Sequence, residues 1–126
     1  MATVMAARHD ELTGANDEVI ASLHALGQAL EENATEERLL SQRIKEMIAA
    51  REGGADWADV LKHEDYPGTV HLVSSTLARL STASGHVRRS LVVALRAEGV
   101  TIPVIARLFG VTHQRVSNLL RRGPSS

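Results

Sequence analysis

The segment TIPVIARLFGVTHQRVSNLLRR, from Thr101 to Arg122, lies near the C-terminal end of the chain and is the most informative part of its sequence. Apolar residues recur at helical spacing on both sides of Gly110. Gly110 stands where a helix commonly ends in a left-handed residue, and Thr112 can then cap a second helix. The stretch therefore predicts two helices joined by a turn of about three or four residues. The residues that we expect at the crossing of these helices are Ile105, Ala106, Phe109, Gly110, Val116 and Leu119.

The second of these helices has an outward face of hydrogen-bonding side chains without an acidic residue. A buried helical hairpin would show the same apolar spacing, but it would not explain this polar face. The face favours a nucleic-acid partner, because amides, hydroxyls and guanidinium groups contact bases and phosphates. The candidate DNA-binding residues are Thr112, His113, Gln114, Arg115, Ser117, Asn118, Arg121 and Arg122.

Together with a preceding helix expected over Val87–Glu98, this stretch resembles the three-helix helix-turn-helix of bacterial transcription regulators. Sigma-factor region 4 and resolvase DNA-binding domains share that arrangement. The resemblance covers Val87 to Arg122 and rests on Ala106, Gly110 and the apolar residues around them. It implies that the second helix lies in the major groove of double-stranded DNA, with its N-terminal end nearest the bases.

The resemblance also implies which side chains read bases. Gln114 and Asn118 carry amides that can pair bidentately with adenine. Because they stand four residues apart, they share one face of a helix. His113 can donate a hydrogen bond to guanine.

Other side chains of the same helix suit the phosphate backbone. Thr112 and Ser117 offer hydroxyls to phosphate oxygens, and Arg121 and Arg122 are expected to contact the backbone rather than the bases. Two roles stay open for Arg115, a phosphate contact and packing against the first helix of the pair.

Charge divides the chain into an acidic and a basic part. Residues 1–69 contain fourteen acidic and six basic residues, whereas residues 70–126 contain eight arginines and one acidic residue, Glu98. The formal net charge of −1 therefore conceals a C-terminal part whose charge suits phosphates. The acidic part is compatible with a basic protein partner, and equally with the solvated exterior of a coiled coil.

The first half of the chain carries a heptad pattern of apolar residues. A helix over Asp17–Glu52 would be roughly 54 Å long, and its apolar stripe needs a partner. One partner is the same helix of a second chain, with Asn33 setting the register; the alternative is a hairpin, with the helix broken near Asn33. We expect the long helix, paired in a homodimer. Its proposed oligomerisation residues are Val19, Leu23, Leu26, Leu30, Asn33, Leu40, Ile44 and Met47.

Helical spacing continues through the rest of the chain without an alternating strand pattern, so we expect an all-α protein. The weak helix-forming stretch Ser81–Gly85 predicts a break, and Trp57 is expected to pack in a core. The expected organisation is a flexible N-terminus (1–16), a coiled-coil-like oligomerisation segment (17–54), middle helices (55–85), a helix-turn-helix domain (86–122) and a tail (123–126).

Several kinds of chemistry lack their residues in this sequence. The chain has no cysteine, which excludes disulfides and thiolate metal sites, and it contains no metal-binding motif of established spacing. We expect no metal, no cofactor and no catalytic residue, because 126 residues leave little room for a catalytic domain beside a helix-turn-helix. The sequence lacks the run of about 18 apolar residues that would span a membrane.

These patterns predict a sequence-specific double-stranded DNA-binding protein that acts as a homodimer. We expect a cytoplasmic bacterial transcription regulator or nucleoid-associated protein. The alternative is a protein-interaction adaptor that uses the helix-turn-helix and the acidic first half as docking surfaces.

Overall fold

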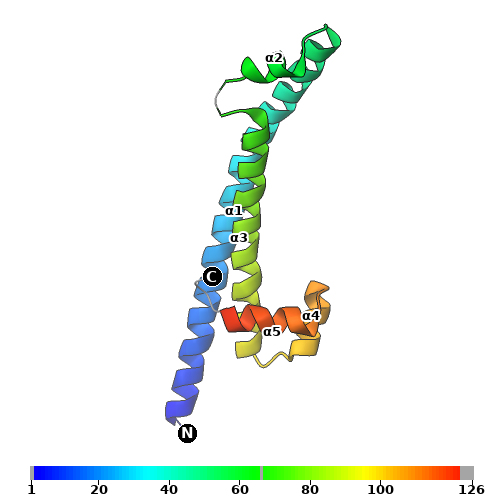
Figure 1. Cartoon of the computed structure of the whole chain (residues 1–126). Coiled ribbons are helices and arrows are strands. Elements are labelled where there is room, and N and C mark those ends of the chain that lie inside the picture. The colour runs from blue at the N-terminus through cyan, green and yellow to red at the C-terminus, as the bar shows by residue number, and fades with distance from the viewer. Residues whose placement is uncertain (1, 66, 123–126) are drawn as a thin grey trace. The chain divides into compact units, whose positions relative to one another are not determined.

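A computed structural model of the chain describes residues 2–65 and 67–122, with side chains described over 10–65 and 67–121. The described part contains helices and no strand, which confirms the all-α class (Figure 1). The five helices are α1 (Ala2–Glu52), α2 (Trp57–Lys62), α3 (Thr69–Ala97), α4 (Ile102–Phe109) and α5 (His113–Arg122). No helix in this described part is long and apolar enough to cross a membrane.

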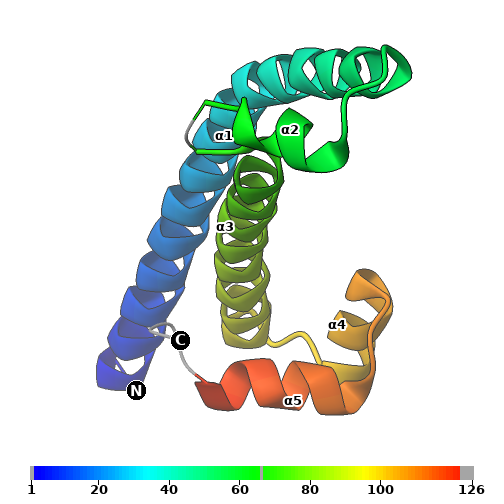
Figure 2. The ribbon, with the colours of Figure 1, turned by 45° about the horizontal axis from the view of Figure 1, so that its top comes forward.

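Contacts within the chain group it into two units that divide α1 and α3 between them. The helix-turn-helix unit comprises Met1–Leu26 and Ala83–Ser126, and the middle unit comprises Gly27–Thr82. In each unit a segment of α1 runs beside a segment of α3, as both Figure 1 and Figure 2 show. Each unit therefore has its own set of packed side chains.

The long N-terminal helix is confirmed, and the hairpin broken near Asn33 is not present. α1 begins at Ala2, well before the expected start near Asp17, and it continues to Glu52. The following Gly54 has a φ of 105°, a left-handed conformation that glycine adopts without strain and that ends the helix.

α1 packs along a heptad stripe, but the partner is α3 of the same chain. Of the proposed oligomerisation residues, Asn33 and Leu40 are buried inside the middle unit, and Val19, Leu26 and Met47 are partly buried. A second heptad position is also covered, and it holds smaller or polar residues: Ser22, Ala29, Glu36 and Arg43. The more apolar residues Leu23, Leu30 and Ile44 stay 43–50% exposed.

Ser22 and Ala29, the small residues at this second position, allow α1 and α3 to approach closely. In the helix-turn-helix unit the hydroxyl oxygens of Ser22 and Ser90 lie 2.8 Å apart, and Ser90 also donates to the carbonyl of His86 at 2.8 Å. Ala29 is buried in the middle unit. A leucine in place of Ser22 would push the two helices apart. For this reason α3 covers the side of α1 that carries the small residues and leaves the side that carries Leu23 and Leu30 exposed.

A polar cluster sets the register between α1 and α3 in the middle unit. The side-chain nitrogen of Asn33 donates to the carbonyl of Thr76 at 3.4 Å, and its oxygen accepts from Arg79 at 3.2 Å. Glu36 accepts from the Thr76 hydroxyl at 2.7 Å and forms an ion pair with Arg79 at 3.2 Å. The Thr76 hydrogen bond first, and Arg79 after it, hold the pKa of Glu36 below its ordinary value of 4.5.

The loop between α2 and α3 is also fixed by polar contacts of the middle unit. Glu64 accepts hydrogen bonds from the backbone nitrogen of Thr69, at 3.2 Å, and from its hydroxyl, so that its carboxylate caps the start of α3. Arg43 on α1 donates to the carbonyl of Pro67 at 3.0 Å. These contacts hold the start of α3 beside α1.

Two expectations about the middle of the chain are wrong. The break over Ser81–Gly85 does not occur, because α3 is continuous from Thr69 to Ala97. A glycine inside a helix costs about 1 kcal/mol relative to alanine, and burial of neighbouring residues such as Val87 outweighs that cost. Trp57 is not in a core: it is 52% exposed and lies beneath the guanidinium group of Arg51, whose carbon is 5.5 Å from the ring centroid.

Candidate nucleic-acid interface

The candidate interface belongs to a domain built from the end of α3 and the short helices α4 and α5. α3 ends at Ala97, and Gly99 follows with a φ of 90°. The backbone nitrogen of Val100 donates to the carbonyl of Leu95 at 3.0 Å, which closes the helix end. The chain is thus turned away from α3 within three residues and can begin α4 at once.

α4 begins with the residues that suit a helix start. Thr101 is extended, with φ −75° and ψ 155°, and its carbonyl accepts from the backbone nitrogen of Ile105 at 3.0 Å. The threonine hydroxyl makes no capping hydrogen bond. Pro103 lies in the first turn, where its missing N–H leaves no partner unsatisfied.

The turn between α4 and α5 depends on glycine. Gly110 has φ 65° and ψ 35°, and the next residue, Val111, donates its backbone N–H to the carbonyl of Ala106 at 3.0 Å. Apart from Gly110 itself and its two chain neighbours, no residue has an atom within 4 Å of the position that a Cβ would take at Gly110. Glycine is therefore required by the left-handed backbone and not by a close neighbour.

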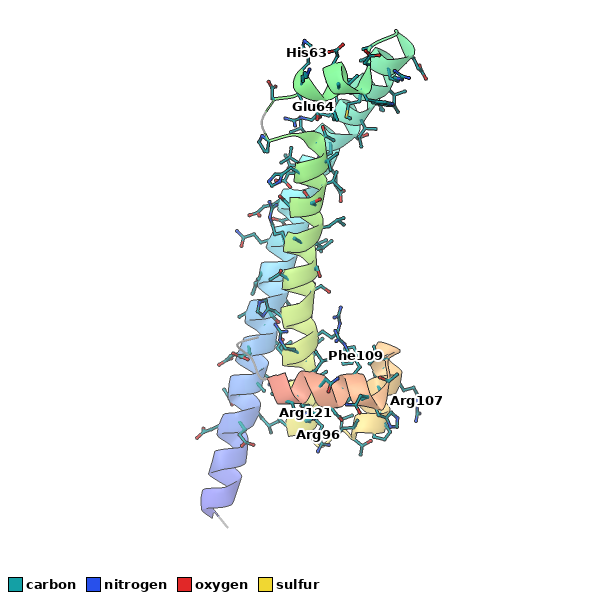
Figure 3. All side chains as sticks on the ribbon, in the orientation of Figure 1. His63, Glu64, Arg96, Arg107, Phe109 and Arg121 are labelled. Atoms are coloured by element: carbon teal, nitrogen blue, oxygen red, sulfur yellow. The ribbon has the colours of Figure 1, made fainter. Side chains whose placement is uncertain are left out.

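A buried apolar core fixes α5 on the rest of the domain. The side chains of Val92, Ile105 and Val116 have no exposed surface, and Ala106 and Leu119 are 3% exposed. Of the predicted crossing residues, the structure places Ile105, Ala106, Val116 and Leu119 in this core. The partly buried Phe109 lies against the core and is labelled in Figure 3, and Gly110 forms the turn.

Val92 is a core residue that is not among those predicted from the sequence at the helix crossing. It lies on α3, three residues before Leu95, and this spacing is the signal that could have found it. Through Val92 the last turns of α3 form one wall of the core, so α3 is the first helix of a three-helix domain.

The polar face of α5 points away from this core. His113, Gln114, Arg115 and Arg121 are exposed, and Ser117 and Asn118 are partly exposed. The hydroxyl of Thr112 accepts from the backbone nitrogen of Arg115 at 3.1 Å, so Thr112 caps the helix. The remaining candidate, Arg122, is the last residue of α5, and its side chain lies outside the described residues.

Three side chains on this face are joined by hydrogen bonds. The amide nitrogen of Gln114 donates to the Oδ1 atom of Asn118 at 3.2 Å. Arg121 donates to the same oxygen. The base-reading residues expected from the sequence are therefore coupled to an arginine that is expected to contact phosphate.

The charge around α5 is positive. In residues 83–121 the acidic residue is Glu98, and none of the six arginines forms an ion pair with a described acid. Arg96, Arg107 and Arg121 project from α3, α4 and α5 in Figure 3. Their charges are therefore not neutralised by described acidic neighbours and can attract phosphates.

Metal-ligand residues do not gather in the described part of the chain. Over residues 2–65 and 67–122 no group of three or more histidine, aspartate or glutamate side chains could hold a metal ion. His63 and Glu64 appear together in Figure 3, but Glu64 is occupied by its contacts with Thr69.

Comparison with protein families identifies the same segment. Residues 86–122 match the family model of the homeodomain-like domain. The matched range includes the end of α3 and all of α4 and α5, and it contains every residue of the buried apolar core. Comparisons with the curated proteins and with the solved structures returned no match.

Proposed function

We propose that this protein recognises specific sequences of double-stranded DNA through the outward face of α5. The match of residues 86–122 to the homeodomain-like domain supports a small helix-turn-helix DNA-binding protein. The proposal extends to a homodimer that acts as a bacterial transcription regulator or a nucleoid-associated protein. It assigns base contacts to His113, Gln114 and Asn118.

The observation that carries the proposal is the contrast between the two faces of α5. Val116 and Leu119 on the inward face are 0% and 3% exposed, whereas the outward face presents amide, imidazole and guanidinium groups. A helix held rigidly on one side and polar on the other can enter the major groove, which is about 12 Å wide, without reorganising.

Phosphate contacts are assigned to the hydroxyls and arginines around this face. Thr112 and Ser117 lie near the start and the middle of α5, and Arg115 and Arg121 are exposed. Each arginine that neutralises a phosphate releases counterions, so affinity should fall steeply as salt rises. Base contacts would then provide the sequence preference that remains.

Exposed apolar residues of the middle unit support the homodimer. Ile44, Ile48, Trp57 and Val70 are 43–69% exposed, and with Met47 and Val73 they line a groove of about 400 Å³. Apolar surface of this kind is costly to leave in water and is typical of protein interfaces. A two-fold dimer would present two copies of α5 to half-sites about 34 Å apart, or a multiple of that distance.

Selection of bound fragments from a random double-stranded DNA pool tests the function. We expect an enriched sequence with two-fold symmetry, bound with an affinity that falls steeply with salt. Substitution of His113, Gln114 and Asn118 by alanine should abolish the enrichment but retain salt-dependent binding. Absence of DNA binding at low salt would refute the proposal and favour the protein-interaction adaptor.

A matched control separates loss of base contacts from loss of folding. Leu108 is 66% exposed on α4 and has no place in the proposed interface, so Leu108→Ala should leave the enriched sequence unchanged. Sedimentation of the protein alone gives the oligomeric state, and a monomer at the concentrations that bind DNA would contradict the homodimer.

A further inference from the structure

We infer that Arg121 and Asn118 form a positioning pair that orients the amide of Gln114, and that Gln114 alone pairs bidentately with adenine. This inference rests on the proposed function, since it concerns how the same face of α5 reads DNA. It reassigns Asn118, which the sequence suggested as a second adenine reader, and it gives Arg121 a task in specificity as well as a phosphate contact.

The starting point is one oxygen atom that accepts two hydrogen bonds. The Oδ1 atom of Asn118 accepts from the amide nitrogen of Gln114 at 3.2 Å and also from the guanidinium group of Arg121. The three residues stand at positions 114, 118 and 121, so their side chains project from neighbouring turns of one helix face. Both lone pairs of the Asn118 oxygen are therefore in use.

Donor and acceptor chemistry determines which way each amide faces. An arginine can only donate, so the atom of Asn118 that faces Arg121 must be its oxygen and not its nitrogen. That oxygen can only accept, so Gln114 must turn its NH2 group toward it. The orientation of Gln114 is thus set by Arg121 through Asn118, whose oxygen accepts a hydrogen bond from each of them.

This orientation leaves a defined set of groups for the bases. Gln114 keeps its Oε1 atom as an acceptor and the second hydrogen of its amide nitrogen as a donor, which is the pair that adenine requires at N6 and N7. Asn118 keeps only its NH2 group, because its oxygen is occupied. Asn118 can therefore donate to a base, but it cannot form the bidentate contact with adenine.

Loss of Arg121 should release this orientation. Without the arginine, the Asn118 amide can rotate by half a turn and offer its nitrogen to Gln114, whose own amide then turns its oxygen inward. The adenine preference should fall even though Gln114 is still present. An aspartate at position 118 cannot rotate in this way, since both of its oxygens are acceptors.

The test compares base preference within each variant, so that a change in total affinity does not enter. On duplexes that differ at single positions, the wild type should prefer adenine at one position by roughly 10-fold or more, and Gln114→Ala should remove that preference. Arg121→Ala should reduce it by at least about 3-fold. The double variant Asn118→Asp with Arg121→Ala should restore the adenine preference, although the added negative charge lowers the affinity for all duplexes alike.

Two results would overturn the inference while leaving the proposed function intact. The first is an adenine preference that is unchanged in Arg121→Ala when total affinity falls, because Arg121 would then contact only phosphate. The second is a double variant that fails to recover the preference. If the wild type binds no DNA, the proposed function fails, and that outcome is distinct from both.

A measurement without DNA tests the same orientation. In the free protein, the side-chain amide signals of Gln114 in a ¹⁵N NMR spectrum should shift in Arg121→Ala and should return toward their wild-type positions in the double variant with Asn118→Asp. Unchanged Gln114 signals in Arg121→Ala would show that Arg121 does not orient this amide. Arg107→Ala is the control, because Arg107 is an exposed arginine on α4 and not on α5.

Discussion

The two units of this chain hold their helices together by different means. In the helix-turn-helix unit the most deeply buried side chains are apolar, with Val92, Ile105 and Val116 at 0% exposure. In the middle unit the most deeply buried side chain is Asn33, at 2%, and Thr69 and Thr76 are also buried. The core shared by α3, α4 and α5 in the first unit is apolar, and the buried Ser90 of that unit contacts Ser22 on α1 instead of belonging to this core. In the middle unit, polar side chains are the most deeply buried.

The difference fits what each unit has to do. Apolar packing of α4 and α5 gives high stability over a small area and fixes the face that is proposed to enter DNA. A polar cluster contributes less net free energy, but it specifies a single register between two long helices. Leu40 of α1 is buried in the middle unit, whereas Leu30 and Ile44 of the same helix stay exposed there.

The largest effect is expected from a cavity in the apolar core. Ile105→Ala should lower the free energy of unfolding of the helix-turn-helix unit by about 2–5 kcal/mol, since it removes buried methylene groups from a site with no exposed surface. Urea denaturation followed by circular dichroism measures the change. Val104→Ala, one residue away and 39% exposed, is the control, and an equal loss in the two variants would contradict the described core.

A smaller effect is expected in the polar cluster of the middle unit. Asn33→Ala should lower the free energy of unfolding by about 1–3 kcal/mol, because it leaves the carbonyl of Thr76 without its Asn33 donor and removes an acceptor of Arg79. The same denaturation experiment applies, with the exposed Thr35→Ala as its control. If Asn33→Leu proved more stable than the wild type and kept the same register, the polar cluster would not be needed to align the helices.

Alanine substitutions at two glycines should change the stability of the protein in opposite directions. Gly110→Ala should destabilise the protein by about 1–2 kcal/mol, because residue 110 has a φ of 65°. Gly27→Ala should stabilise it by about 0.5–1 kcal/mol, because Gly27 is inside α1 and, apart from the adjacent helix backbone, no atom lies within 4 Å of the position of an added Cβ. Thermal unfolding of the two variants gives both values. A stabilising Gly110→Ala would mean that the turn does not have the left-handed conformation.

The smallest effect is a pH dependence that comes from Glu36. Its pKa is lowered in the folded protein, chiefly by the hydrogen bond from Thr76 and then by Arg79, so the unfolded chain binds the proton more readily. The stabilisation is therefore present above the ordinary pKa of 4.5 and is lost as pH falls through the lower, folded value. Urea midpoints measured from pH 6 down to about pH 3 should fall more steeply in the wild type than in Glu36→Gln. Identical slopes would show that Glu36 is not stabilised as an anion.

The helix-turn-helix could be predicted because its signals are local. Gly110 and Thr112 mark a helix end and a helix start within three residues, and the apolar spacing around them predicts both helices. These features act through the backbone conformation and capping of single residues. Such effects do not depend on the rest of the chain, so the sequence alone reveals them.

The partner of α1 could not be predicted in the same way. A heptad stripe indicates that a helix is covered, but it does not distinguish α3 of the same chain from a second α1. The side of the stripe that is covered depends on close approach at Ser22 and Ala29, which is a property of the packed pair. The continuity of α3 through Ser81–Gly85 also comes from packing, which overrides weak helix propensity.

The hydrogen bonds between side chains on α5 also could not be predicted from the sequence. The positions of Gln114, Asn118 and Arg121 place them on one helix face, and that much follows from spacing. Which amide atom faces which neighbour depends on side-chain rotamers. The structure supplies this through the shared oxygen of Asn118.

The proposed function requires that the outward face of α5 reads the sequence of double-stranded DNA. The most direct measurement is the ratio of the dissociation constants for a selected duplex and a scrambled duplex, in the wild type and in Gln114→Ala. We expect this ratio to change by roughly 5- to 150-fold, which corresponds to about 1–3 kcal/mol for one lost bidentate base contact. A ratio that is the same in both proteins would contradict the account.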